Sequence, residues 1–65
     1  MKYIKILRMQ RGLKYSDVAK VTGISAGTIW RIENGYPYQA KTMNKLVEFY
    51  DVPEQRLLKE IEFFG

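Results

Sequence analysis

The sequence contains no cysteine and no histidine among its 65 residues. Without cysteine no disulfide bond can form, and without either residue type the thiolate and imidazole ligands of the common metal sites are missing. No continuous apolar run approaches the roughly 20 residues of a membrane span, and the first residues lack the apolar stretch and cleavage site of a signal peptide. We therefore expect a cytoplasmic protein with no metal, no cofactor and no membrane association, held together by its hydrophobic core alone.

The sequence also contains no recognisable catalytic motif. The carboxylates are scattered along the chain, no nucleophile has a histidine or cysteine partner, and no glycine run of the kind that cradles phosphates occurs. The sequence therefore gives no indication of an enzyme.

The sequence does contain an uneven distribution of charge. Residues 1–45 carry nine basic and two acidic side chains, a balance of +7, within a chain whose formal net charge is +4. Residues 46–65 carry two basic and five acidic side chains, a balance of −3. The basic part favours a polyanionic partner.

Glycine and proline divide the chain into five segments in which apolar residues recur at helical spacing. The breaks fall at Gly12, Gly23, Gly35, Pro37 and Pro53. The pattern predicts one all-α domain over residues 1–65, built from five short helices, with Pro53 in the first turn of the last. The expected inward-facing residues are Ile4, Leu7, Arg11, Val18, Ala19, Thr22, Ile29, Ile32, Ala40, Met43, Leu46, Val47, Tyr50, Leu57, Leu58 and Ile61.

Residues 16–33 form a unit of helix, tight turn and helix. Gly23 suits the reversal of the chain, and Ile24 fills the gap between the two helices. Ser25 can cap the second helix by accepting a hydrogen bond from the backbone N–H of Thr28. The segment is therefore predicted to be a helix-turn-helix.

Four segments match those of a known family in order and spacing, and they are IKILRMQRGL (4–13), DVAKVTGIS (17–25), TIWRIENG (28–35) and LVEFYDVPEQRLL (46–58). On these segments the chain resembles the Cro and repressor amino-terminal family, the XRE-type helix-turn-helix proteins. The resemblance implies a compact five-helix, lambda-repressor-like domain that binds double-stranded DNA as a homodimer and regulates transcription, typically as a repressor. Arg8 and Glu33 match an arginine and a glutamate that form an internal ion pair in relatives.

The resemblance also assigns residues to a DNA interface. The helix over about 26–33 corresponds to the recognition helix, in which Ala26, Gly27 and Arg31 take the base-contacting positions. Trp30 is also predicted to contact the bases, by packing on sugar and base edges. The expected phosphate contacts are Lys14, Tyr15, Ser25, Thr28, Asn34, Tyr36, Tyr38 and Lys41.

The chemistry of these side chains suggests how they would act. Arg31 can pair two donors with guanine, and the methyl group of Ala26 can meet the methyl group of thymine. Gly27 either lets the helix backbone sit deeper in the groove or makes room for the indole of Trp30. Lys14 is a poor cap, so a DNA phosphate could complete the free N–H groups at the start of the second helix.

Ala26 and Gly27 replace hydrogen-bonding side chains, and this departure from the family supports a second hypothesis. The protein could be an interaction module, similar to an antirepressor or an antitoxin, that binds a regulatory protein through the Ala26-Gly27-Trp30 surface. Trp30 could also fold over neighbouring aliphatic side chains as ordinary partial burial.

The carboxyl-terminal segment 53–65 is predicted to form the dimer interface. Leu58, Ile61, Phe63 and Phe64 present more apolar surface than a 65-residue monomer easily covers. The alternative is that Phe63 and Phe64 fold back on the first helix and complete the monomer's own core.

Overall fold

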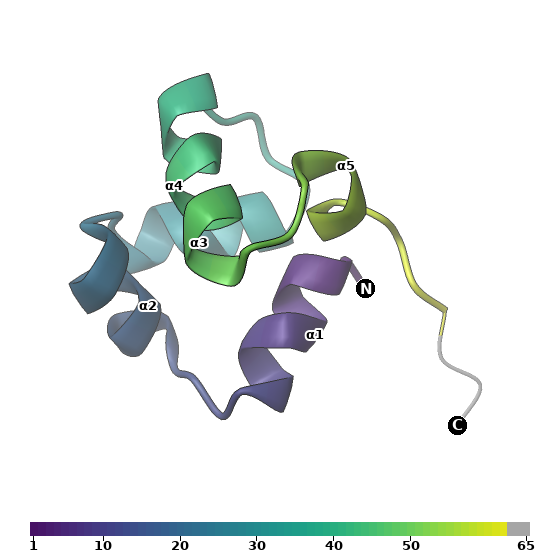
Figure 1. Ribbon diagram of the computed structural model, residues 1–65, viewed down its shortest axis with the longest axis horizontal. Helices are drawn as coiled ribbons and strands as arrows, with labels where there is room; N and C mark the ends of the chain where they lie inside the picture. Colours follow the sequence, from purple (N-terminus) through teal and green to yellow (C-terminus); the bar gives the residue numbers. More distant parts are fainter. Residues whose placement is uncertain (63–65) are drawn as a thin grey trace.

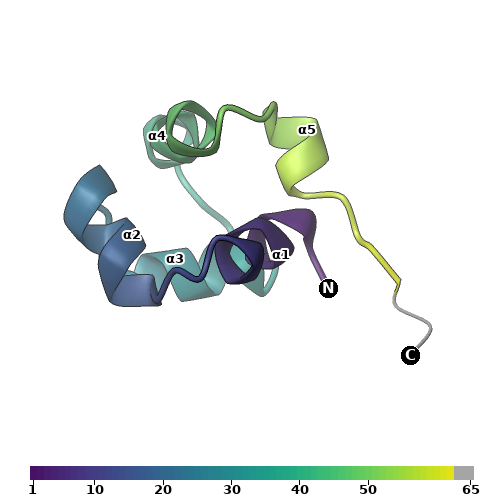
Figure 2. The same cartoon turned by 60° about the horizontal axis from the view of Figure 1, so that its bottom comes forward.

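The structure, a computed structural model, describes residues 1–62 and contains five helices, which confirms the predicted fold class. The helices are α1 (Tyr3–Gln10), α2 (Tyr15–Thr22), α3 (Ala26–Glu33), α4 (Ala40–Tyr50) and α5 (Glu54–Leu57). Figure 1 shows α2 on one side of the molecule and α5 on the other. In Figure 2, α1, α2 and α3 form the lower side of the molecule and α4 and α5 the upper side.

Glycine and serine set the helix boundaries around the turn between α2 and α3. Gly23 ends α2 in the left-handed conformation, with φ +76°, and its N–H donates to the carbonyl of Ala19 at 2.9 Å. Ser25 begins α3, and its hydroxyl accepts a hydrogen bond from the Thr28 N–H at 3.2 Å, which confirms the predicted cap. Gly35, with φ +84°, turns the chain away after α3.

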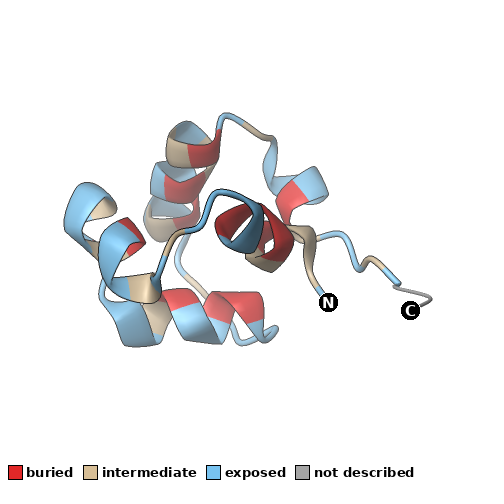
Figure 3. Cartoon of the chain, turned by 90° about the horizontal axis from the view of Figure 1, so that it is seen from below, coloured by how far each residue is buried: buried red, intermediate tan, exposed pale blue. Residues whose placement is uncertain are grey.

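The core lies where the inner faces of the helices meet. Figure 3 shows the buried positions of each helix turned toward the centre and the exposed positions turned outward. This is the pattern expected of amphipathic helices around one core. The core residues are Ile4, Leu7, Val18, Ile24, Ile29, Ile32, Met43, Leu46, Tyr50 and Leu57.

Two of the predicted inward positions are wrong. Arg11 caps the end of α1 and is exposed, and its guanidinium donates to the carbonyl of Tyr50 at 3.2 Å. Ala40 is exposed because it is the first residue of α4, before the helix reaches the core. The basic residue of α1 that is buried is Arg8, and it is buried together with Glu33.

The fifth helix is shorter than predicted, and Ile61 is not on it. α5 ends at Leu57, and the chain then runs back along the start of α1. The N–H of Ile61 donates to the carbonyl of Met1 at 2.8 Å, and the N–H of Tyr3 donates to the carbonyl of Lys59 at 2.9 Å. These backbone bonds hold residues 59–61 extended instead of helical, with an antiparallel bridge in their middle.

Charge reinforces this pairing, which we call the terminal clasp (residues 1–3 with 59–61). The carboxylate of Glu60 forms ion pairs with the ammonium group of Met1 at 3.0 Å and with Nζ of Lys2 at 3.2 Å. The hydrogen bond from the amino terminus, followed by the one from Lys2, lowers the pKa of Glu60. Both ion pairs involve an exposed carboxylate, so we expect each to contribute little to stability.

Candidate nucleic-acid interface

α3 has one face in the core and one face in solvent. Ile29 and Ile32 are 0% and 1% exposed and anchor the inner face. Gly27 and Arg31 are exposed on the opposite side, where the 3.6-residue period of the helix puts them, and Ala26 is exposed as the first residue of the helix. The outward side of α3 is therefore open to a partner along its length (Figure 3).

The space around Gly27 is empty within this chain. A Cβ atom built on Gly27 meets no atom within 4 Å. The interpretation that Gly27 makes room for the indole of Trp30 is therefore wrong, because an alanine would fit there equally well.

Trp30 packs against the loop that follows α3. Its ring centroid lies 5.8 Å from that of Tyr36, and the rings are inclined at 43°. Asn34 donates from Nδ2 to the carbonyl of Trp30 at 2.8 Å and closes the end of the helix. Trp30 and Tyr36 are 46% and 50% exposed, so this aromatic pair remains accessible at the edge of the outward face.

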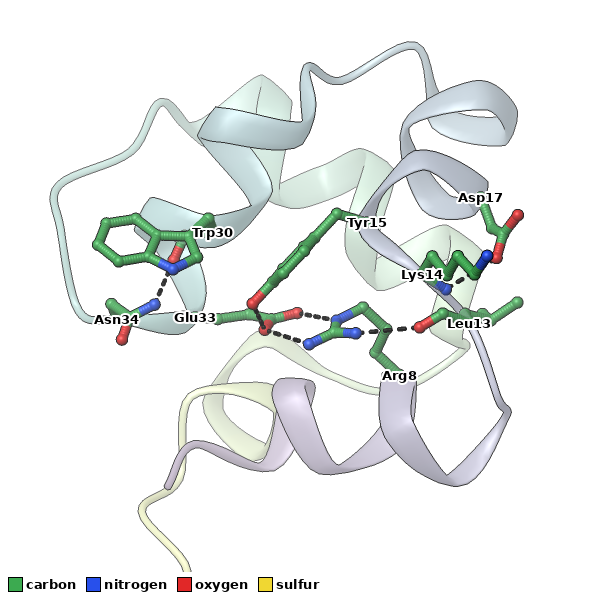
Figure 4. A network of polar contacts seen from close by, with 8 residues as sticks. All are labelled: Arg8, Leu13, Lys14, Tyr15, Asp17, Trp30, Glu33 and Asn34. Carbon is green, nitrogen blue, oxygen red and sulfur yellow. Dashed lines mark hydrogen bonds and ion pairs between the residues drawn. The ribbon is translucent and has the colours of Figure 1, made fainter.

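The carboxyl-terminal end of α3 is also held by the predicted ion pair between Arg8 and Glu33, which is present (Figure 4). Nε of Arg8 donates to Oε2 of Glu33 at 2.8 Å, and Nη2 donates to Oε1 at 3.1 Å. The remaining Nη1 donates to the carbonyl of Leu13 at 3.0 Å. The hydrogen bonds that Arg8 donates to Glu33 raise the pKa of Arg8, so the guanidinium stays charged. The pair ties α1 and the following turn to the last residue of α3.

Tyr15 is part of this network, which the sequence did not predict. Its hydroxyl donates to Oε1 of Glu33 at 3.0 Å, and the guanidinium carbon of Arg8 lies 3.9 Å from the centre of its ring. Burial, and then the charge of Glu33, raise the pKa of Tyr15. The single proton of the phenol is therefore engaged inside the domain, at the position where a phosphate contact is predicted.

The tyrosines of the loop between α3 and α4 have different surroundings. The hydroxyl of Tyr38 donates to the carboxylate of Glu54 on α5, and this hydrogen bond raises the pKa of Tyr38. Tyr36, by contrast, is exposed beside Trp30. Only Tyr36 of these two presents a hydroxyl for which no intramolecular hydrogen bond is found within residues 1–62.

The remaining candidate phosphate ligands surround α3. Lys14 is the exposed N-cap residue of α2, and its side chain makes no capping hydrogen bond. Its backbone N–H donates to Oδ2 of Asp17 at 2.7 Å. Ser25 and Thr28 bond to each other, since the Ser25 hydroxyl donates to Oγ1 of Thr28 at 2.8 Å. Lys41 lies exposed in the first turn of α4.

Of the residues predicted to form a dimer interface, the structure describes Leu58 and Ile61. Leu58 and Ile61 are half-buried, beyond the end of α5. Phe63 and Phe64 lie outside the described residues. In the part of the chain that is described, no helix has the length and apolarity to cross a bilayer, and no cluster of acidic side chains could hold a metal ion.

An eight-residue helix, a three-residue turn and a second eight-residue helix with one buried and one exposed face define a helix-turn-helix domain. A family model described as "Helix-turn-helix domain" matches residues 2–59, which is most of the chain. The chain therefore belongs to this helix-turn-helix family, which is of the XRE and Cro type and consists of DNA-binding regulators. A search of the curated proteins and a search of the solved structures each give no match.

Proposed function

We propose that the protein is a transcriptional repressor that binds specific sequences in double-stranded DNA by placing α3 in the major groove. The observation that carries this proposal is the outward face of α3, where Ala26, Gly27 and Arg31 are exposed while Ile29 and Ile32 hold the helix to the core. The major groove has the width of an α-helix. A domain bound there keeps other proteins off the same stretch of DNA, which is the simplest route to repression.

Arg31 and Ala26 supply the base contacts in this proposal. Arg31 is exposed in the middle of the outward face and can donate two hydrogen bonds to O6 and N7 of a guanine. The methyl group of Ala26 meets the methyl group of a thymine. Trp30, at the edge of the same face, packs on the base and sugar edges beside the helix.

Phosphate contacts position the domain on either side of the groove. Lys14 and Lys41 supply charge, and backbone N–H groups in the first turn of α2, which the Lys14 side chain does not cap, donate to a phosphate. The hydrogen-bonding contacts are Thr28, Asn34 and Tyr36, while Ser25 is left out because its only hydroxyl proton goes to Oγ1 of Thr28. Tyr15 and Tyr38 are left out of the proposed contacts, because each already donates its only hydroxyl proton to a carboxylate.

The alanine substitution of Arg31 tests the base contact. Arg31→Ala is expected to weaken binding to the preferred site by about 1–3 kcal/mol and to relax the choice of base at one position. Lys14→Ala is the matched control and is expected to weaken binding to all sequences alike, since a phosphate carries no sequence information. The preferred site comes from selection among random duplexes at low salt, and duplexes with single base changes then give the preferences. An Arg31→Ala protein with the parent's preferences would show that Arg31 contacts no base.

A second candidate function is favoured by the exposed aromatic pair. Tryptophan and tyrosine are frequent at the centres of protein interfaces, and Trp30 and Tyr36 lie beside the small residues Ala26 and Gly27. In this alternative the protein is an antirepressor or antitoxin-like module that binds a regulatory protein through this surface. It requires no salt-dependent complex with DNA, so a salt titration separates the two functions.

We also propose that two copies bind DNA as a homodimer through segment 53–65. Leu58 and Ile61 are half-buried, and the apolar residues Phe63 and Phe64 follow them in the sequence. A two-fold dimer sets two copies of α3 one DNA turn apart, about 34 Å, on a pseudo-palindromic site. The alternative is that Phe63 and Phe64 fold back on α1 of the same chain. A groove there, next to the terminal clasp, is lined by Met1, Ile6, Met9 and Gln10.

Deleting residues 62–65 tests the dimer. The deletion spares the core residues and the terminal clasp that the structure describes within residues 1–61, so the fold is expected to persist while self-association weakens. Affinity for a double half-site is expected to fall toward that for a single half-site. Sedimentation measures the first effect and DNA titration the second, with Glu62→Ala as a control that removes only the charge. Truncated and intact proteins that are equally monomeric at high concentration, with equal DNA affinity, would contradict a dimer mediated by this segment.

A further inference from the structure

Gly27 has no reason within this chain to be glycine. Its backbone is ordinary helix, since the glycines with positive φ are Gly12, Gly23 and Gly35. A Cβ at Gly27 would meet nothing within 4 Å, so no neighbouring side chain needs the space. A helix that contains glycine is less stable than one with alanine at the same position, because the glycine backbone loses more conformational freedom on folding. Glycine at this position therefore lowers the stability of the domain, and no contact or backbone angle in the described structure requires it.

The place of Gly27 on α3 indicates what it contacts in a bound partner. Gly27 precedes Arg31 by four residues, so the two lie one turn apart on the same exposed face of α3. An arginine that reaches a guanine from this face brings the α3 backbone at Gly27 close to the edge of a nearby base. A missing side chain there shortens the distance between backbone and DNA.

From this geometry we infer that Gly27 determines sequence specificity by admitting the 5-methyl group of a thymine against the bare backbone of α3. This inference rests on the proposed DNA binding and adds a second specificity position to that of Arg31. Gly27 and the neighbouring Ala26 offer no side-chain donor or acceptor. A polar base edge opposite them would lose its water without replacement, whereas the thymine methyl group loses none and gains an apolar contact.

The test combines changes in the protein with changes in the DNA. Gly27→Ala and Gly27→Leu add side chains of increasing size, and both residues are better helix formers than glycine. In the selected duplex each thymine is replaced in turn by deoxyuridine, which lacks only the 5-methyl group. The parent protein is expected to lose about fourfold in affinity at one deoxyuridine position per half-site, the value of one buried methyl group.

The two Gly27 variants are expected to fold as well as the parent, with thermal midpoints equal to it or higher, and yet to bind DNA more weakly. Gly27→Leu is expected to lose at least tenfold in affinity and to bind thymine and deoxyuridine duplexes equally, with Gly27→Ala between it and the parent. Val21→Ala and Val21→Leu are matched controls, because Val21 is an exposed helical residue on α2 that is 70% exposed and outside the proposed contacts. Both are expected to bind as the parent does.

The outcomes separate this inference from the proposed function. A parent protein that binds no duplex overturns the proposed function. A parent that binds DNA but is indifferent to every thymine methyl group overturns the inference alone. Gly27 variants with the parent's affinity, or a deoxyuridine effect that survives in Gly27→Leu, also overturn it.

Discussion

Glu33→Ala is expected to lower the free energy of unfolding by about 3–5 kcal/mol, because it leaves the guanidinium of Arg8 buried without its counter-charge. Arg8 is 8% exposed and Glu33 is 4% exposed, so water cannot replace the lost partner. Tyr15 would also lose the acceptor of its hydroxyl. A domain of this length has a stability of about 3–10 kcal/mol, so the substitution is expected to remove a third or more of it.

Urea and thermal denaturation measure this effect, and Tyr50→Phe is the matched control. The hydroxyl of Tyr50 is buried without a hydrogen-bond partner among residues 1–62, and burial raises its pKa to about 12. Its removal leaves no donor or charge unpaired, so the stability is expected to stay within about 1 kcal/mol of the parent or to rise. A thermal midpoint unchanged in both Glu33→Ala and Arg8→Ala would mean that the pair contributes nothing to the fold.

The affinity for duplex DNA is expected to fall steeply with salt. About four to six neutralised phosphates per site give a slope of log K against log salt of about −3.6 to −5.4, at about −0.9 per phosphate. Between 50 and 200 mM salt this corresponds to a loss of roughly 10²- to 10³-fold. The motivation is the balance of +7 in residues 1–45, which include Lys14 and Lys41 on exposed positions around α3.

Fluorescence anisotropy on the selected duplex measures this slope. Lys14→Ala is expected to make the slope shallower by about 1, as the loss of one phosphate contact requires. A slope near zero, or no binding below 50 mM salt, would instead support the function in which the Ala26-Gly27-Trp30 surface binds a protein.

The fold could be predicted from the sequence because local rules set it. Helical spacing of apolar residues gave the five helices, and the helix ends at Gly23 and Ser25 followed from backbone freedom and capping. The same spacing put Gly27 and Arg31 on the exposed side of α3, where the structure has them. The ion pair between α1 and α3 followed from the family resemblance.

The features that were missed depend on contacts between distant residues. Tyr15 bonds to Glu33, 18 residues away, and no local pattern distinguishes such a phenol from one that faces solvent. The end of α5 at Leu57 could not be foreseen, because backbone bonds to the start of the chain decide it.

The terminal clasp also makes a circular permutation of this chain possible. Because the N–H of Ile61 bonds to the carbonyl of Met1 at 2.8 Å, a linker of a few residues could join residue 61 to residue 1 without crossing the domain. New ends could then be opened between Gly35 and Pro37, in the exposed loop between α3 and α4. A circular permutant of this kind would carry its termini beside α3, so that a fused reporter would sit next to whatever α3 contacts.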